Sequence, residues 1–333
     1  MAIANDREAG PMSGQGTSGA VRRRLDDRRW HFQHGPIDCI VAADGDAHAV
    51  AAAVERAWSR FQPLLAELAA ELPLLRADLR APPGQSLSPR GPVARRMVAA
   101  CRPHAADGRF ITAMAAVAGS VAEELIAAFD DPAIARAAVN NGGDIALCLR
   151  PEASFAIGVC ADPLRGRFAT PLDGRFAIDA ASAIRGIATS GWRGRSFSLG
   201  IADSVTILAS SASAADAAAT IVANAVDVDD ARIVRAPASA LRDDSDLGDR
   251  LVTRNVPPLP AALVALALAR GVAEARAQVA ADRIVAAVLS LQGRWSVVGE
   301  VAAALPANAT STSSTPPVHA LVRTDDAHAL LPC

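Results

Sequence analysis

The sequence predicts an α+β fold in which a largely antiparallel sheet packs against helices. Segments with strand character cluster between residues 137 and 209, and they do not alternate one-for-one with helices, as a doubly wound parallel sheet would require. Ala- and Leu-rich stretches with apolar residues at helical spacing lie on both sides of this cluster. Hydrophobic residues make up 51% of the 333 residues and aromatic residues only 4%, so we expect a core of Ala, Val, Leu and Ile.

Helices are predicted where apolar residues recur three and four positions apart. Pro63 is expected to break or kink the first of them, because proline cannot donate the backbone hydrogen bond of a helix interior. Ser213 is expected to cap the Ala-rich helix of the C-terminal half, since a serine hydroxyl accepts from the free N–H groups of the first turn. The predicted helices are 47–79, 93–101, 114–129, 213–226 and 260–281.

Strands are predicted where apolar and polar residues alternate between turn signals. Gly35-Pro36 and Gln292-Gly293 are expected to turn two hairpins, and polar or Pro-rich stretches at 81–93, 102–109 and 243–249 are expected to be loops. The segment 196–209 is expected to form a strand pair or one bent strand. The remaining strand segments are 30–43, 137–149, 154–160, 175–180, 187–190, 232–235 and 284–298.

The composition predicts one domain, over 26–305, between a disordered N-terminus (1–25) and a mobile Ser/Thr/Pro-rich tail (306–333). The first residues lack the pattern of a secretory signal, and the most apolar run, 259–269, is too short to span a bilayer. We therefore expect a cytoplasmic protein without a membrane partner. A net charge of −2 argues against nucleic acid, because phosphate binding needs a clustered basic excess.

Two absences limit the chemistry. The chain has no Lys, so all 33 basic residues are Arg, and it has no Tyr. Schiff-base chemistry and a P-loop lysine are thereby excluded. The five Cys are odd in number and form no CxxC pair, so we expect buried free thiols rather than a disulfide framework or a four-cysteine zinc site.

Asn141, Gly142, Gly143 and Asp144 form the first candidate segment for a binding site. Two adjacent glycines permit positive φ and close approach of a ligand, while the flanking polar groups can bind a sugar or a base. The same residues are also favoured in a simple two-residue hairpin turn. Both interpretations remain open from the sequence.

Asp216 and Thr220 form the second candidate, because residues i and i+4 share one helical face. Their oxygen atoms suit Mg²⁺, which takes few protein ligands and completes its shell with water or phosphate. Alternatively, Asp216 favours the helix dipole and Thr220 bonds back to a carbonyl.

Three further features complete the candidate residues. Thr189, Ser190 and Gly191 combine small hydroxyl groups with glycine, which suits phosphate or ribose contacts as well as an ordinary strand end. Arg193 and Arg195 flank Gly194 and can meet an anion or form a solvated turn. His104 is a candidate for an acid or base, although a lone His is more often structural or exposed. No Cys or second His lies at ligand spacing from it, so no zinc site is expected there.

In their order along the chain, three segments resemble the ApbE family of flavin transferases: VNNGGDIAL (139–147), GIATSG (186–191) and SVTILASSASAADAAAT (204–220). Further segments at 102–125, 188–209 and 244–252 resemble in particular an ApbE-like branch of unknown function. The resemblance covers roughly 30–300 and implies an ApbE-like, T-fold-related domain. It also implies an FAD ligand or substrate, Mg²⁺, and transfer of FMN to a hydroxyl of an acceptor protein or cleavage of FAD to FMN and AMP.

The resemblance assigns roles residue by residue. Asp216, Thr220 and the backbone carbonyl of Ala118 match the metal ligands, while the glycine turn and the Thr189–Gly191 stretch match the nucleotide site. The sequence departs from the transferases in two places. Their Lys in the small-residue helix corresponds to about Gly119, and their His-containing segment is here shortened to 191–203 without His.

These departures leave two functional hypotheses. The chain is an enzyme of FMN transfer or FAD pyrophosphate cleavage, or it is a non-catalytic flavin- or nucleotide-binding accessory protein in cofactor or sulfur metabolism. A scaffold with a degenerate site is a third alternative, and a homodimer is the assembly we would test first.

Overall fold

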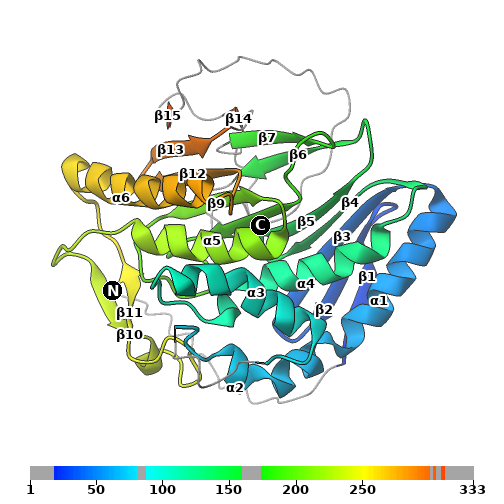
Figure 1. Cartoon of the computed structure of the whole chain (residues 1–333), viewed down its shortest axis with the longest axis horizontal. Coiled ribbons are helices and arrows are strands. Elements are labelled where there is room, and N and C mark those ends of the chain that lie inside the picture. Colours follow the sequence, from blue (N-terminus) through cyan, green and yellow to red (C-terminus); the bar gives the residue numbers. More distant parts are fainter. Residues whose placement is uncertain (1–18, 81–87, 160–173, 301–302, 305–308, 312–333) are drawn as a thin grey trace, which may run out of the picture.

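One ten-stranded sheet forms the centre of the computed structural model, which describes residues 19–80, 88–159, 174–300, 303–304 and 309–311 (Figure 1). Its strand order is β1-β2-β3-β4-β5-β8-β9-β12-β13-β15. Every neighbouring pair is antiparallel except β13 with β15. The predicted α+β fold with a largely antiparallel sheet is therefore confirmed. The strands are β1 (Val21–Arg24), β2 (Arg29–His34), β3 (Ile37–Gly45), β4 (Ile134–Asn141), β5 (Asp144–Leu149), β8 (Gly186–Ser190), β9 (Ser204–Ala209), β12 (Ala286–Leu291), β13 (Arg294–Gly299) and β15 (Ala309–Ser311).

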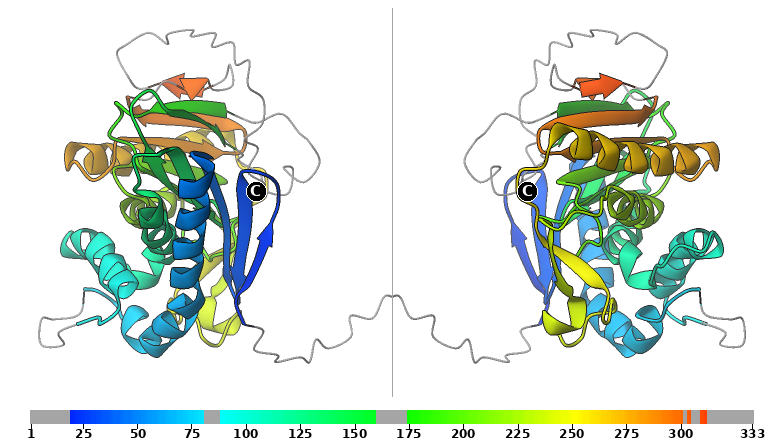
Figure 2. Two further views of the ribbon diagram at one scale, coloured as in Figure 1. Left: turned by 90° about the vertical axis from the view of Figure 1, so that its right-hand side faces the viewer. Right: turned by 90° about the vertical axis from the view of Figure 1, so that its left-hand side faces the viewer.

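The long helices cover one face of this sheet, as the two side views show (Figure 2). Helix α1 packs on β2 and β3, α4 on β4 and β5, α5 on β8 and β9, and α6 on β12 and β13, while α3 lies outside α4 and α5. Their apolar faces and the sheet enclose the two largest core clusters. The helices are α1 (Ala47–Ala70), α2 (Leu72–Leu75), α3 (Pro92–Ala106), α4 (Val117–Ile126), α5 (Ala212–Ala225) and α6 (Ala261–Ala280), with short 3₁₀ turns at Ala113–Ala116, Ala127–Phe129 and Ala238–Ala240.

A hairpin of β6 (Ser154–Val159) and β7 (Gly174–Asp179) contributes to a separate core cluster. Phe155, Ile157 and Ile178 from this hairpin pack with alternate side chains of β5 and β12, such as Leu147 and Val288. Strand β14 (Ala303–Ala304) extends the hairpin, and β10 (Val234–Pro237) pairs separately with β11 (Leu251–Asn255). The central strands β9 and β12 are buried along their whole length.

The predicted hairpins are confirmed. Strands β2 and β3 turn at Gly35 (φ 55°), and β12 and β13 turn at Gln292 and Gly293 (φ 46° and 76°). The pair β4 and β5 likewise turns at the predicted glycines. These turns were predictable because each depends on local backbone chemistry.

Two prolines lie inside helices. Helix α1 continues through Pro63 to Ala70, so of the two alternatives expected there the break is wrong. Helix α3 continues through Pro103 to Ala106, where a loop was expected. Because Pro63 has no N–H, the carbonyl of Ser59 lacks its usual helical hydrogen bond. Both residues are exposed, so water can bond this carbonyl. The helix begins as its cap requires, since the Asp46 carboxylate accepts from the N–H groups of His48 and Ala49.

The prediction of strand structure throughout 196–209 was also wrong, because only Ser204–Ala209 forms a strand. The preceding residues bond to the end of α5 instead: Leu199 N–H donates to Asn224 Oδ1 and Ile201 N–H to the Val226 carbonyl. The cap of α5 is Ser211, not Ser213. Strands β1, β11, β14 and β15 were not predicted. Strand β1 lies within the N-terminus expected to be disordered, and β15 within the expected tail. Residues 1–18, 306–308 and 312–333 of these two segments lie outside the described residues.

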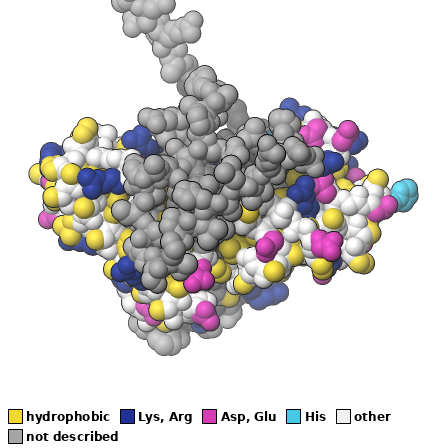
Figure 3. Space-filling view, turned by 90° about the horizontal axis from the view of Figure 1, so that it is seen from above, with side chains coloured by type: hydrophobic (Ala, Val, Ile, Leu, Met, Phe, Trp, Pro, Cys, Tyr) yellow, Lys and Arg dark blue, Asp and Glu magenta, His cyan; other side chains and the backbone are white. Residues whose placement is uncertain are grey.

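The surface carries charges of both signs, and the described cysteines are free thiols. Where Figure 3 colours side chains, basic and acidic groups are interspersed around the face it shows. None of the described helices is both long enough and apolar enough to cross a membrane. Cys39, Cys101 and Cys148 are free thiols, the first two of them buried; Cys160 and Cys333 lie outside the described residues.

Candidate functional site

Four elements converge at one end of the central sheet: the β4–β5 turn, the end of β8, the start of α4 and the first turns of α5. Asp216 on α5 accepts a hydrogen bond at Oδ2 from the backbone N–H of Gly119, at 2.9 Å. Asn141, at the end of β4, donates from Nδ2 to the carbonyl oxygen of Ala118 at 3.2 Å. The metal and nucleotide candidates, far apart in the sequence, are thus joined through α4.

Asp144 connects the glycine turn to the end of β8. Its Oδ1 accepts a hydrogen bond from the backbone N–H of Thr189 at 3.2 Å, and the Thr189 hydroxyl bonds that of Thr206 at 2.9 Å. Asn141 and Asp144 are buried, whereas Gly142 and Thr189 are exposed. The carboxylate therefore lies beneath an accessible rim.

The glycine turn has the backbone that its sequence predicts. Asn141 pairs with Asp144 across the hairpin, so Gly142 (φ 67°) and Gly143 (φ 112°) form a two-residue turn. The side chain of Asn140 holds the turn, since its Oδ1 accepts from the Gly143 N–H at 2.8 Å. The hairpin interpretation is confirmed, and a contact of this turn with a nucleotide stays a prediction.

The two carboxyl groups of the site are electrostatically coupled. Burial raises the pKa of Asp216 to about 7, against hydrogen bonds from the Gly119 and Ala118 N–H groups that lower it. Burial, together with the negative charge of Asp216, raises the pKa of Asp144 well above its ordinary value. Without a counter-charge, both groups therefore resist ionisation near neutral pH.

This donor set fits a hard cation. Asp144 and Asp216 offer carboxylate oxygens and Ala118 a carbonyl oxygen. A bound cation would offset the burial that raises the pKa of both carboxyl groups and the charge of Asp216 that further raises the pKa of Asp144. In the described part of the chain no group of three or more His, Cys, Asp or Glu side chains is arranged to hold a metal ion. A cation here would take the rest of its shell from backbone, water or ligand, as Mg²⁺ commonly does.

The other predicted residues lie around this group. Thr220 follows Asp216 by one turn of α5 and is half-buried, while Ser190 and Gly191 end β8. The backbone of Gly191 approaches the next segment closely, since a Cβ there would lie 2.4 Å from the Asp203 carbonyl oxygen. No hydrogen bond among the described residues joins Thr220 or Ser190 to either carboxylate, so their ligand roles stay predictions.

Two functional positions were missed by the sequence reasoning. Asn140 holds the turn, and Gly119 lets α4 approach α5 so closely that its N–H reaches Asp216. The small-residue run Ala116–Ser120 was the available signal for Gly119, because helices that cross closely need small side chains. Asn140 gave no separate signal, since either neighbouring asparagine suits a turn.

The structure does not bring His104 to this group. It lies in the last turn of α3, 2% exposed, and its Nδ1 has no hydrogen-bond partner among the described residues. The groups that influence it are Arg283, Asp107 and Arg109, and among the described residues no contact links it to Asp144 or Asp216. Burial lowers the pKa of His104 to about 4, so the imidazole is neutral at physiological pH.

His104 should instead make the fold sensitive to acid. Because its folded-state pKa is about 4 and an unfolded His titrates near 6.5, the unfolded state binds more protons between these values. Stability should therefore fall as pH drops from 6.5 to 4, by up to about 3 kcal/mol. In thermal unfolding, His104→Leu should lose less stability over this window than the wild type, whereas the exposed His48→Leu should behave like the wild type. Parallel pH profiles for wild type and His104→Leu would contradict this role.

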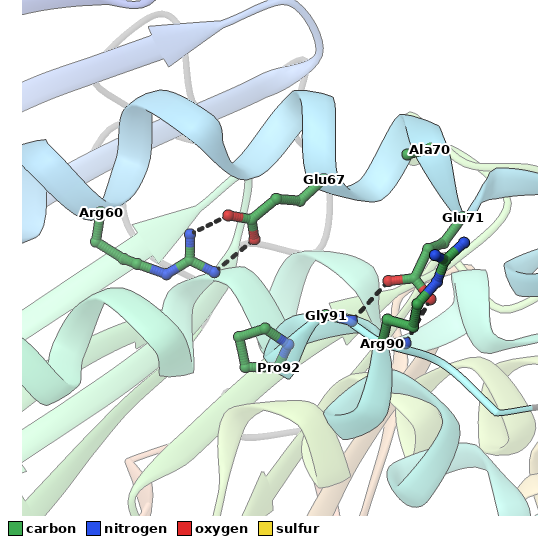
Figure 4. A pocket seen from close by; sticks show the side chains of 7 residues that line it. All are labelled: Arg60, Glu67, Ala70, Glu71, Arg90, Gly91 and Pro92. Atoms are coloured by element: carbon green, nitrogen blue, oxygen red, sulfur yellow. Dashed lines mark hydrogen bonds and ion pairs between the residues drawn. The ribbon is translucent and has the colours of Figure 1, made fainter.

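The hollow shown in Figure 4 lies elsewhere, between α1 and the start of α3, and has a volume of about 530 Å³. Three of its four charged side chains, those of Arg60, Glu67 and Glu71, already have hydrogen-bond partners. Arg60 makes two hydrogen bonds to Glu67, and the Glu71 carboxylate accepts from the N–H groups of Arg90 and Gly91. Since no predicted site residue lines this hollow, we place the candidate site at the paired carboxylates instead.

Comparison with known proteins agrees with the motifs at this site. A family model described as AbpE bacteria matches residues 22–297. The UPF0280 protein of Methanoculleus marisnigri is 38% identical over 150 residues, which are 45% of this chain and 59% of that protein. The UPF0280 protein of Methanosphaerula palustris is 37% identical over 37% of this chain and 49% of its own length, and that of Methanococcoides burtonii is 31% identical over 60% and 77%.

The chain spans about half to three-fifths of the first two of these relatives. Among solved structures, the ApbE protein from Thermotoga maritima matches 55% of this chain and 66% of its own, at 19% identity and a TM-score of 0.28. The family model covers most of the chain and includes every residue of the candidate site. The chain therefore belongs to the ApbE-like family that this model describes as AbpE bacteria.

Proposed function

We propose that the site binds FAD or a related nucleotide together with Mg²⁺. One observation carries the proposal: hydrogen bonds gather Asp144 and Asp216, from a strand and a helix far apart in sequence, around the start of α4. Asp216 accepts from the Gly119 N–H, and Asn141, which pairs with Asp144, donates to the neighbouring Ala118 carbonyl. The charge of Asp216 also raises the pKa of Asp144. A buried and a half-buried carboxyl group in such a pair are costly without a cation.

The surrounding residues support a nucleotide as the second ligand. Gly142 and Gly143 leave an exposed backbone surface beside the carboxylates, and the exposed Thr189 borders it. A ligand phosphate can therefore approach a cation held by Asp144, Asp216 and the Ala118 carbonyl. When bound, Mg²⁺ supplies charge neutralisation for a pyrophosphate. The motif resemblance suggests FAD as the nucleotide.

Binding without chemistry is the form of this function that the geometry favours. His104 lies near Arg283, Asp107 and Arg109 and so is not placed to act as an acid or base at the carboxylates. A side chain at Gly119, the position that corresponds to the transferase lysine, would collide with α5. FMN transfer to an acceptor protein or cleavage of FAD is the second form. It would require the cation and a bound water or acceptor hydroxyl to act without a lysine.

The first test is titration calorimetry of the purified chain with FAD, with 5 mM Mg²⁺ or with excess chelator, at about pH 8. We expect binding that is at least about tenfold tighter with Mg²⁺. Chromatography of the same mixtures separates the two forms: unchanged FAD supports binding alone, whereas Mg²⁺-dependent FMN and AMP demonstrate cleavage. Absence of FAD binding with and without Mg²⁺ would refute flavin as the ligand.

A further inference from the structure

A guanidinium group lies over the glycine turn of the candidate site. Arg195 belongs to the connection between β8 and β9, and its Nη2 lies 1.7 Å from the point where a Cβ of Gly142 would stand. A side chain at Gly142 would push the guanidinium aside, so the glycine leaves room for it at this place. Arg195 is also close enough for its positive charge to oppose the rise in the pKa of Asp144 and of Cys39, the residue that pairs with Asn141 across β3 and β4.

Arg195 differs from its neighbour Arg193 in how its charge is used. Arg193 forms an ion pair with Asp203 at 3.2 Å and lies over the ring of Trp192, 4.8 Å from its centroid. For Arg195, by contrast, no ion pair with a described carboxylate is found, and its side chain is exposed. Its five N–H donors are thus available at the rim of the site.

The segment that carries Arg195 is held firmly on both sides. The Asp203 carboxylate accepts from the Trp192 indole N–H at 3.2 Å and from the Gln292 backbone N–H at 2.5 Å. Trp192 N–H also donates to the Ala202 carbonyl at 3.0 Å. The base of the loop is therefore fixed, so a ligand that contacts Arg195 need not order the whole segment.

We propose that Arg195 is a specificity residue that binds a phosphate group of the ligand and makes the site select phosphorylated flavins over uncharged riboflavin. The planar guanidinium matches the geometry of phosphate oxygens and can bond two of them at once. Its place over Gly142, close to Asp144, lets it meet a ligand phosphate at the rim of the same site. This inference rests on the proposed binding of a flavin nucleotide.

The test compares Arg195→Gln with the matched charge removal Arg193→Gln, using fluorescence titration with FAD, FMN and riboflavin at fixed Mg²⁺. We expect Arg195→Gln to weaken FAD and FMN binding about 10- to 100-fold, the cost of one charge-assisted contact, and to leave riboflavin affinity unchanged. Arg193→Gln should stay within about threefold of the wild type, and Arg195→Lys should recover part of the affinity. Because Arg195 is exposed, its variants should melt like the wild type.

The outcomes separate this inference from the proposed function. If the wild type binds FAD and Arg195→Gln binds it equally well, the role of Arg195 is refuted while flavin binding stands. If the wild type binds no flavin, the same variants are titrated with inorganic pyrophosphate. Loss of pyrophosphate binding in Arg195→Gln alone then upholds the phosphate contact, and equal binding or no binding refutes it.

Discussion

Replacing Asp216 by Asn is expected to remove Mg²⁺ binding and to make the metal-free protein more stable above neutral pH. The amide keeps an oxygen that can accept the Gly119 N–H, which now reaches Oδ2 at 2.9 Å, so the packing of α4 on α5 should survive. It loses the charge that a hard cation needs. We expect Mg²⁺ affinity to fall about 100-fold or more, since losing even a group that only orients a metal ligand costs about 10- to 100-fold.

The stability effect follows from the raised pKa. An unfolded Asp releases its proton near pH 4, whereas Asp216 in the folded, metal-free protein holds it to about pH 7. Between these values the folded state binds more protons than the unfolded state, so the stability of the wild type falls as pH rises from 4 to 7. Asp216→Asn removes that titration and the repulsion on Asp144. Its melting temperature should exceed that of the wild type by a few degrees at pH 8 and match it near pH 4.

Thermal unfolding from pH 4 to 8, with and without Mg²⁺, checks both parts of this prediction. Mg²⁺ should raise the melting temperature of the wild type at pH 8 and leave that of Asp216→Asn unchanged. Asp282→Asn is the matched control, because Asp282 is exposed and adopts a left-handed backbone (φ 59°) that asparagine accepts. Equal stabilisation of wild type and Asp216→Asn by Mg²⁺ would show that the cation binds elsewhere.

Local features of this fold could be predicted from the sequence. The Gly142-Gly143 turn, the hairpin at Gln292-Gly293 and the Ala-rich helix that carries Asp216 all depend on residues near one another in the chain. The break considered at Pro63 and the loop expected from residue 102 were wrong, since tertiary packing of α1 and α3 and the exposure of both prolines outweigh the local cost.

The assembly of the site could be predicted only through the motif resemblance. The sequence spacing of Asp144 and Asp216 does not predict that their charges interact. The interaction depends on the position of α4, which is hydrogen-bonded both to Asn141 beside the glycine turn and to Asp216 on α5. The position of Arg195 was also beyond the sequence. From the sequence, Arg195 could meet an anion or form a solvated turn, and only the fold brings it over Gly142. The residues that follow it were expected to form strand, but the bonds of Leu199 and Ile201 to the end of α5 hold them outside the sheet.

Replacing Gly119 by Ala is expected to disrupt both the fold and the site. A Cβ on Gly119 would lie 2.2 Å from the Ala212 carbonyl oxygen and 2.9 Å from the Cβ of Asp216. Neither neighbour can move freely. The Ala212 carbonyl belongs to the backbone of the first turn of α5, and both Ala212 and Asp216 are carried by this helix, which packs against β8 and β9. We expect a loss of about 3 kcal/mol in the free energy of unfolding, at the upper end of the cost of overpacking a core.

The same variant should also weaken metal binding, because separating α4 from α5 pulls the Gly119 N–H and the Ala118 carbonyl away from Asp216. Ser120→Ala is the matched control on α4. The Ser120 hydroxyl is buried and has no hydrogen-bond partner in the part of the chain that the structure describes, so its removal should leave stability unchanged or slightly raise it. Denaturant unfolding measures the first effect and Mg²⁺ calorimetry below the unfolding transition the second. A Gly119→Ala protein as stable as Ser120→Ala would mean that α4 and α5 can separate at little cost. In that case the close packing of α4 on α5 would not explain why this position holds glycine where the transferases have a lysine.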